Sequence, residues 1–168
     1  MKIVVTGGAG FIGSHFIRHI LGKYPEFRIL NIDKLTYAGN PENLEEVKNY
    51  PNYSFVNEDI CSKRIIEKAV KGYDVIVNFA AESHVDRSID EPEVFLKTDV
   101  MGTFNLLEIC RTAGIRKYIQ ISTDEVYGSA GGGETFSEES PLNPSNPYSA
   151  SKAAADLLVL SYSKTYKL

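Results

Sequence analysis

Short apolar runs alternate along the chain with longer segments in which apolar residues recur every three or four positions. The runs predict five β-strands, at residues 3–6, 28–32, 53–56, 74–79 and 117–122. The segments between and after them predict four helices, at residues 12–23, 61–70, 92–113 and 147–166. Strands separated by helices are typical of a parallel sheet with right-handed crossovers. The pattern therefore predicts an α/β fold, a doubly wound parallel sheet with helices on both faces.

Two helical segments carry more apolar residues than a surface helix needs. In 94–110 and 153–162 the apolar positions surround nearly the whole helix, whereas one apolar stripe is enough to attach a helix to a core. Deep burial in a larger domain explains this, and so does packing against a partner subunit. The pattern by itself leaves both explanations open.

Length and charge restrict the class of protein. The chain has 168 residues, enough for one domain with a hydrophobic core, and a net charge of −4 with scattered lysines and arginines. This argues against nucleic acid or an anionic membrane as the main partner. Apolar runs are too short for a membrane span or a signal peptide, and Cys61 and Cys110 fit no metal or disulfide pattern. We therefore expect a cytoplasmic protein without a bound metal.

A glycine motif stands where the first strand meets the first helix. Gly7, Gly10 and Gly13 allow a tight turn, close approach of a ligand to the backbone, and close packing of the helix on the sheet. The helix N-terminus then offers free N–H groups to a pyrophosphate. Asp33 ends the second strand, about 20 residues on, where a carboxylate accepts hydrogen bonds from ribose hydroxyls and repels a 2′-phosphate. The motif predicts a Rossmann domain that binds NAD.

Residues that follow the third and fourth strands are expected at the same carboxyl edge of the sheet as the glycine motif. Asp59 and Ile60 follow the third strand, near the expected adenine position, although Asp59 could equally cap the next helix. Ala80 and Ala81 follow the fourth strand, and their small side chains leave room for a dinucleotide across the strand ends.

The chemistry-bearing residues lie in the last third of the chain. Tyr148 and Lys152, four residues apart, share one face of the last helix. We expect the ammonium and a cationic nicotinamide to lower the pKa of the tyrosine, so that it can act as a base. Thr123 follows the fifth strand and can bind a substrate hydroxyl. Asp124 and Glu125 are adjacent carboxylates that can divide the acid and base roles of an elimination. We expect residues 128–146, which come after them, to form an active-site loop.

These stretches together resemble the extended short-chain dehydrogenase/reductase family, and within it the dTDP-glucose 4,6-dehydratases. The glycine motif and Y-x-x-x-K are typical of the superfamily, whereas DKLTYAGN (33–40), AAESHVDRSI (80–89) and Thr-Asp-Glu (123–125) match the narrower group. The resemblance covers essentially the whole chain. Epimerases and decarboxylases of the same superfamily lack the Asp-Glu pair.

The resemblance implies a mechanism and a set of contacts. Tyr148 removes the sugar O4 proton while C4 is oxidised by NAD, Glu125 removes the C5 proton, and Asp124 protonates the departing C6 hydroxyl. Lys152 also holds the nicotinamide ribose, and Ser83, His84 and Thr123 lie near the substrate. Besides Tyr148, Lys152 and the three glycines, the implied cofactor contacts are Phe11, Ile12, Asp33, Lys34, Leu35, Thr36, Asp59, Ile60, Ala80, Ala81, Ser83 and Thr98.

The resemblance also implies a homodimer through the 92–113 and 147–166 helices. The family chain is about twice as long, so we expect the sixth strand and the C-terminal substrate lobe to be absent and this stretch alone to be inactive. Two other functions stay open: an epimerase or decarboxylase of another nucleotide sugar, and a dinucleotide-binding module without catalysis.

Overall fold

In the computed structural model, which describes residues 1–133 and 135–168, five parallel strands form one sheet in the order β3-β2-β1-β4-β5. They are β1 (Lys2–Thr6), β2 (Arg28–Asp33), β3 (Tyr53–Asn57), β4 (Val75–Asn78) and β5 (Lys117–Gln120). The strand order reverses at β1, so the chain moves outward first to one side and then to the other. This confirms the predicted doubly wound fold and creates a crevice at the carboxyl ends of β1 and β4.

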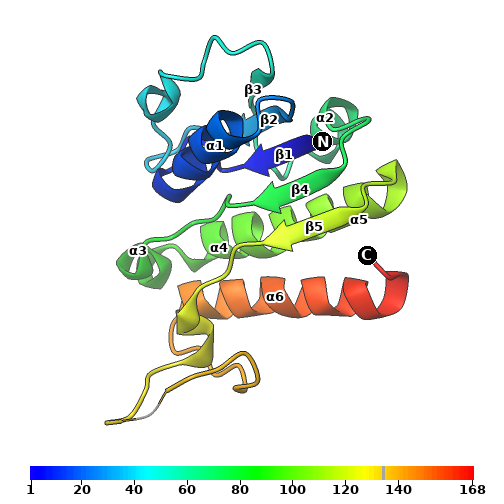
Figure 1. The fold of residues 1–168 in the computed structure, drawn as a ribbon. Coiled ribbons are helices and arrows are strands. Elements are labelled where there is room, and N and C mark those ends of the chain that lie inside the picture. Colours follow the sequence, from blue (N-terminus) through cyan, green and yellow to red (C-terminus); the bar gives the residue numbers. More distant parts are fainter. Residues whose placement is uncertain (134) are drawn as a thin grey trace.

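Helices connect the strands and cover both faces of the sheet (Figure 1). The α-helices are α1 (Phe11–Lys23), α2 (Lys63–Ala69), α3 (Val85–Asp90), α4 (Pro92–Phe95), α5 (Thr103–Ala113) and α6 (Pro147–Tyr166). Three other helical segments are the 3-10 turns η1 (Pro41–Leu44) and η3 (Asp124–Tyr127) and the π-helical η2 (Leu96–Gly102).

Two hydrophobic layers hold the sheet, one on each face. Alternate residues of a strand point to opposite faces, so Val4 of β1 joins the layer that contains Ile66 of α2 and Leu106 of α5. Its neighbours Ile3 and Val5 join the layer on the other face, with α1. Because β1, β2 and β4 are covered on both faces, their sequences are nearly continuously apolar.

Three predicted helix features differ from the structure. The segment 92–113 is helical throughout but is not one α-helix, because the wider π-helical turns of η2 interrupt it. The second helix begins at Lys63 rather than at residue 61, because Asp59 accepts a hydrogen bond from the Cys61 N–H and holds a turn there. The short helix α3 was not predicted.

The strand ends and the start of α6 lie at the same edge of the molecule. In Figure 1 the arrowheads of β1, β4 and β5 point toward the side on which α6 begins. A capping box fixes this start: the Asn146 side chain accepts from the Ser149 N–H at 2.8 Å, and the Ser149 hydroxyl faces the Asn146 N–H. Along its length α6 packs against α5 and η2. The sheet edge and the capped helix together position the candidate site.

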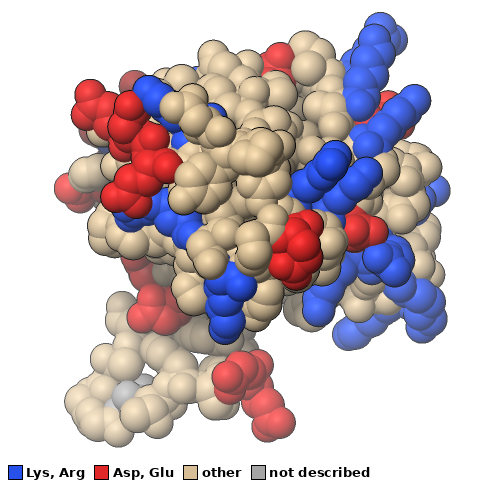
Figure 2. Space-filling model, turned by 45° about the horizontal axis from the view of Figure 1, so that its top comes forward, with Lys and Arg blue, Asp and Glu red and all other residues tan. Residues whose placement is uncertain are grey.

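Charge is dispersed over the face seen in Figure 2. Acidic and basic side chains surround a broad uncharged area, and neither sign covers the face continuously. Among the helices of the described part of the chain, none is both long enough and apolar enough to cross a membrane.

Candidate cofactor and active site

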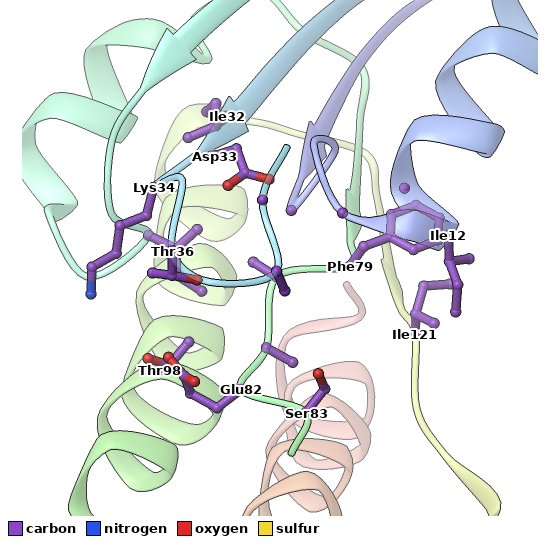
Figure 3. Close-up of a pocket in the computed structure, with 18 of the residues that line it drawn as sticks. Ile12, Ile32, Asp33, Lys34, Thr36, Phe79, Glu82, Ser83, Thr98 and Ile121 are labelled. Carbon is purple, nitrogen blue, oxygen red and sulfur yellow. The ribbon is translucent and has the colours of Figure 1, made fainter. Parts of the chain in front are cut away.

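A cavity of about 530 Å³ opens at the carboxyl ends of the central strands (Figure 3). Most residues predicted to contact the cofactor line it: Gly7, Gly10, Phe11, Ile12, Gly13, Asp33, Lys34, Thr36, Asp59, Ile60, Ala80, Ala81, Ser83, Thr98, Tyr148 and Lys152. Leu35 does not line it; this residue has a positive φ of 56° and serves the turn after β2. Further lining residues were not predicted: Ile32, Ala38, Gly39, Glu58, Phe79, Glu82, Ile121 and Ser122.

The glycine turn is packed so closely that side chains do not fit. Gly7 has a φ of +70°, and a Cβ there would lie 2.5 Å from the Ala80 nitrogen. A Cβ on Gly13 would lie 2.4 Å from the Gly7 carbonyl oxygen, so the first helical turn rests directly on the turn before it. The missing side chains leave a cradle of backbone at the cavity wall, as a bound pyrophosphate requires.

The N-terminus of α1 faces this cradle. Gly10 is its N-cap, and the first amides of a helix have no partners within the helix, so they remain available to an anion. Phe11 and Ile12 are 77% and 62% exposed at the cavity, and Figure 3 shows Ile12 beside Phe79 and Ile121. The cavity therefore has amide donors on one wall and apolar side chains next to them.

Asp33 braces the glycine turn from the end of β2. Its Oδ2 accepts from the Ala9 N–H and its Oδ1 from the Leu35 N–H, both at 2.8 Å, while the residue stays 8% exposed toward the cavity. Each carboxylate oxygen has more than one lone pair, so these bonds leave acceptor capacity for a ribose hydroxyl. The pair Lys34–Asp59 lies nearby, with Nζ and Oδ2 2.8 Å apart.

Asp59 performs both tasks that the sequence suggested. It lines the cavity, and it also accepts from the Cys61 N–H in the turn before α2. Burial raises its pKa, but the hydrogen bonds from Lys34 and from the Cys61 N–H outweigh burial and hold the pKa below its ordinary value. The carboxylate is therefore ionised at neutral pH.

Tyr148 and Lys152 lie on the first turns of α6, at the other side of the cavity. Lys152 is 4% exposed and its Nζ donates to the Ile121 carbonyl oxygen at 2.7 Å. Burial lowers the pKa of Lys152, and the negative charges of Asp99 and Asp156 oppose that effect.

Without a bound cofactor the pKa of Tyr148 lies above its ordinary value, so the lysine alone does not produce the expected lowering. Burial raises the pKa of Tyr148, the hydrogen bond with Thr123 lowers it, and the carboxylates Glu125, Asp99 and Asp124 raise it further. The negative charges of these three acids act on the phenol, whereas the Lys152 ammonium donates to the Ile121 carbonyl oxygen. Although Tyr148 and Lys152 share one face of α6, the lysine ammonium therefore does not lower the pKa of the phenol.

After β5, Asp124 and Glu125 begin the 3-10 turn η3, and Thr123 is its N-cap. The Thr123 hydroxyl caps this turn by accepting from the Glu125 N–H at 3.3 Å. Glu125 is part-buried and its Oε2 accepts from the Asn146 side chain at 3.3 Å, whereas Asp124 is exposed. The residues lie beside Tyr148 but do not line the cavity. Two carboxylates in unlike surroundings thus stand next to the phenol.

The two neighbouring residues predicted to lie near the substrate, Ser83 and His84, occupy different places. Ser83 lines the cavity, whereas His84 is exposed outside the cavity lining and is the residue before α3. The loop predicted at 128–146 includes Glu134, which lies outside the described residues. Among the residues that are described, no group of three or more His, Cys, Asp or Glu is arranged to hold a metal.

Sequence reasoning missed a buried acid below the cavity. Asp99 of η2 is 2% exposed; its Oδ1 accepts from the Glu82 N–H at 2.8 Å and its Oδ2 from the Ser151 hydroxyl at 2.7 Å. It therefore ties the loop after β4 to α6, next to Lys152. The available signal was an acid in a helix whose apolar residues surround nearly its whole circumference, but the segment alone does not say which elements the acid joins.

A parallel sheet of this order, a glycine turn against a helix N-terminus and a Tyr/Lys pair across the crevice define a dinucleotide-binding enzyme fold. The chain belongs to the family whose model is described as GDP-mannose 4,6 dehydratase, which matches residues 4–168. This agrees with the family resemblance read from the sequence.

Individual relatives narrow the group. The chain is 51% identical over its full length to "Low-salt glycan biosynthesis protein Agl12" of Haloferax volcanii and 48% identical to dTDP-glucose 4,6-dehydratase of Streptomyces niveus. It superposes on dTDP-glucose 4,6-dehydratase of Streptomyces venezuelae, solved with NAD and TYD bound, with a TM-score of 0.96 and 49% identity, covering 100% of this chain and 53% of that one. UDP-glucose 4-epimerase of Thermus thermophilus matches with a TM-score of 0.90 at 33% identity, over 100% of this chain and 52% of that one.

The chain spans about half the length of the curated relatives it matches, 54% and 51% for the two named here.

Proposed function

We propose that this protein is a hydro-lyase, an NAD-dependent 4,6-dehydratase of a nucleoside-diphosphate sugar that converts dTDP-glucose to dTDP-4-keto-6-deoxyglucose. The observation that carries the proposal is the position of Asp124 and Glu125 in η3, which packs against the start of α6, where Tyr148 lies. An oxidoreductase needs the tyrosine, but loss of water additionally needs an acid and a base at the same centre. The dehydratases among the relatives support the same assignment.

The residues present fit NAD as the cofactor. The glycine cradle and the first amides of α1 would hold the pyrophosphate, Asp33 the adenosine ribose, Asp59 and Ile60 the adenine, and Lys152 the nicotinamide ribose. Bound NAD supplies the oxidant for the sugar C4 and, once reduced, the reductant for C6. Asp33 disfavours a 2′-phosphate by like-charge repulsion, which makes NAD rather than NADP the expected cofactor.

Tyr148 takes the proton from the sugar O4. Its phenol is hydrogen-bonded with Thr123, which orients it and favours the phenolate. A bound cationic nicotinamide would supply positive charge near the phenol and so favour its phenolate form. Thr123 also offers its hydroxyl to the same sugar oxygen.

Glu125 and Asp124 carry out the elimination. Once C4 is a ketone the C5 proton is acidic, and Glu125, held by Asn146, removes it. Asp124 gives a proton to the departing C6 hydroxyl, which leaves as water, and a proton returns to C5 when C6 is reduced. The two roles match their surroundings, because the exposed carboxyl exchanges protons with solvent and the part-buried one is fixed in place.

Replacing Glu125 tests the proposal. In a chain that carries this segment together with the C-terminal half present in its relatives, supplied with NAD and dTDP-glucose, Glu125→Gln should lower formation of the 4-keto-6-deoxy sugar by about 10²- to 10⁴-fold, followed through its chromophore in alkali. Exchange of the C5 hydrogen with D2O, read by mass spectrometry, should fall equally. Glu26→Gln, at an exposed position between α1 and β2, is the control and should change neither. Unchanged product formation in Glu125→Gln would refute the assignment.

The same assay separates the alternatives. The match to UDP-glucose 4-epimerase makes an epimerase the second candidate. An epimerase would return a 4-epimer without exchanging the C5 hydrogen, and a decarboxylase would release CO₂. A non-catalytic module would bind NAD and convert no sugar.

We also propose a homodimer. Leu157 and Leu160 of α6 are 57% and 52% exposed, and Leu96 and Met101 of η2 are 54% and 51% exposed. Pairing of α6 and the η2–α5 helix with those of a second copy would cover these side chains. Leu160→Glu should convert a dimer to monomers in sedimentation velocity, and a wild-type monomer would contradict the proposal.

The proposed location is the cytoplasm, with a nucleotide sugar rather than nucleic acid or membrane as the partner. Cys61 and Cys110 are both free thiols, as is usual in a reducing compartment. Burial raises the pKa of both, to about 11 and about 12, which keeps them protonated and unreactive. Fractionation of cells with an antibody to the protein tests the location.

A further inference from the structure

Two loops border the cavity from opposite sides of β1. Residues 34–40 follow β2 and contribute Thr36, Ala38 and Gly39 to its lining, and residues 79–84 follow β4 and contribute Glu82 and Ser83. Because β2 and β4 flank β1 in the sheet, the two loops face each other across the glycine turn that ends β1. Figure 3 shows Thr36 and Ser83 on these separate loops, on the border of one cavity.

Tyr37 joins the two loops. Its hydroxyl oxygen accepts a hydrogen bond from the Ser83 N–H at 3.2 Å, although the residues are 46 positions apart in the sequence. Tyr37 is 51% exposed and is not itself part of the cavity lining. Its position is therefore explained by this bridge rather than by burial in the core.

Arg87 of α3 contacts the ring of Tyr37. Its guanidinium carbon lies 4.4 Å from the ring centroid, within the range of a cation–π contact. Its Nη1 lies 4.0 Å from Oε2 of Glu82, and its Nη2 lies 3.4 Å from Oε2 of Glu91. The arginine is thus attached to the loop after β4 as well as to the tyrosine.

The ends of the 34–40 loop are fixed, whereas its tip is not buried. At one end the Leu35 N–H donates to Asp33, and at the other the Asn40 N–H donates to the Ala9 carbonyl oxygen at 3.0 Å. Thr36, Tyr37 and Ala38 between them are exposed. Breaking the contacts of Tyr37 would free the tip while both anchors stay in place.

We propose that Tyr37 is a positioning residue that retains the dinucleotide: it latches the two loops across the crevice and slows cofactor release. This rests on the proposed function. In that reaction the reduced dinucleotide and the keto sugar must stay together until C6 is reduced, so early release would leave the enzyme without its reductant. A latch on the crevice meets that need without contact with the reacting atoms.

Dissociation of NADH tests the latch without requiring turnover. NADH bound to the protein is displaced by excess NAD+ in a stopped-flow instrument, and the loss of its fluorescence gives the dissociation rate. Tyr37→Phe keeps the ring for Arg87 and removes the hydrogen-bond acceptor, so the rate should rise about five-fold, equivalent to ~1 kcal/mol for one net hydrogen bond. Tyr37→Ala removes the ring contact too, and the rate should rise about fifteen-fold.

Matched variants separate the latch from a general effect. Tyr50→Phe, at another exposed tyrosine, should leave the rate unchanged. Arg87→Gln, which leaves Tyr37 in place, should also speed release, and the thermal midpoints of all variants should agree with that of the wild type. If wild type and Tyr37→Phe release NADH at the same rate, the latch is refuted. If the wild type binds neither NAD+ nor NADH, the proposed function itself fails.

Discussion

Asp99 is a buried acid whose ionisation should weaken the fold. It is 2% exposed, and burial raises its pKa to about 6, against the hydrogen bonds from Ser151 and from the Glu82 N–H that lower it. In an unfolded chain the ordinary value is 3.8. The difference corresponds to about 3 kcal/mol at 1.36 kcal/mol per pKa unit.

The sign of the effect follows from the raised pKa. Below about pH 4 the carboxyl is protonated in both states, so its contribution to the free energy of unfolding is fully present. Between about pH 4 and pH 6 the unfolded state has lost its proton while the folded state still holds it, so the contribution falls and is lost above about pH 6. At pH 8 the buried charge therefore lowers stability by about 3 kcal/mol relative to a neutral group in the same place.

Asn is the suitable replacement, because it supplies both hydrogen bonds without the charge. Its amide oxygen can accept from the Glu82 N–H, and its amino group can donate to the Ser151 oxygen, because the Ser151 proton can turn to the Tyr148 carbonyl oxygen, 2.7 Å away. Asp99→Asn should therefore unfold like the wild type at pH 4 and be more stable at pH 8, by up to about 3 kcal/mol.

Urea unfolding followed by far-UV circular dichroism, at intervals from pH 4 to pH 8, measures the difference. Subtracting the two curves removes the titration of all other groups. Asp90→Asn, at an exposed position of α3, should give a flat difference. A variant that is less stable than the wild type at pH 8, or a difference that does not change with pH, would refute the reasoning.

Three further substitutions test the fold and the cofactor site. Gly13→Ala places a Cβ 2.4 Å from the Gly7 carbonyl oxygen, so NAD binding measured by calorimetry should weaken at least ~10-fold and the unfolding free energy should drop by about 1–3 kcal/mol. Leu106→Ala empties a fully buried site between α5 and the sheet and should cost about 2–5 kcal/mol in urea unfolding. Asp33→Asn removes the charge that disfavours a 2′-phosphate, so the preference for NAD over NADP in paired titrations should narrow roughly 10-fold; an unchanged ratio would contradict that role.

The sheet was predictable because the physics that forms it is local in sequence. Continuous apolar runs identify strands covered on both faces, and Gly7 and Asp33 identify the edge at which the ligand binds, because a turn of that tightness and an acid at that strand end have few other uses. The unpredicted α3 is only six residues long and lies between two polar stretches, too short for helical periodicity to appear.

The features that the sequence did not predict depend on distant groups. In 94–110 the apolar residues surround nearly the whole helix, so the pattern does not show which face is buried. A change of the buried face, which would indicate the π-helical η2, could therefore not be detected. The pKa of Tyr148 is set by burial and by Glu125, Asp99 and Asp124, which only the tertiary structure brings together. Lys152 was correctly placed beside the cavity, but its bond to the Ile121 carbonyl oxygen was not foreseeable from a spacing of four residues.

The π-helical turns of η2 change the direction in which side chains face along the helical segment 92–113. An α-helix advances about 100° per residue, so each surplus residue in a π-helical turn rotates the helix before it by about that angle relative to the helix after it. Asp99, within η2, reaches Glu82 and Ser151, while Leu106 of α5, after η2, packs against the sheet. A designer who moved this helix to another scaffold would have to keep the π-helical turns, since they set the rotation between the buried acid and the apolar residues that follow it.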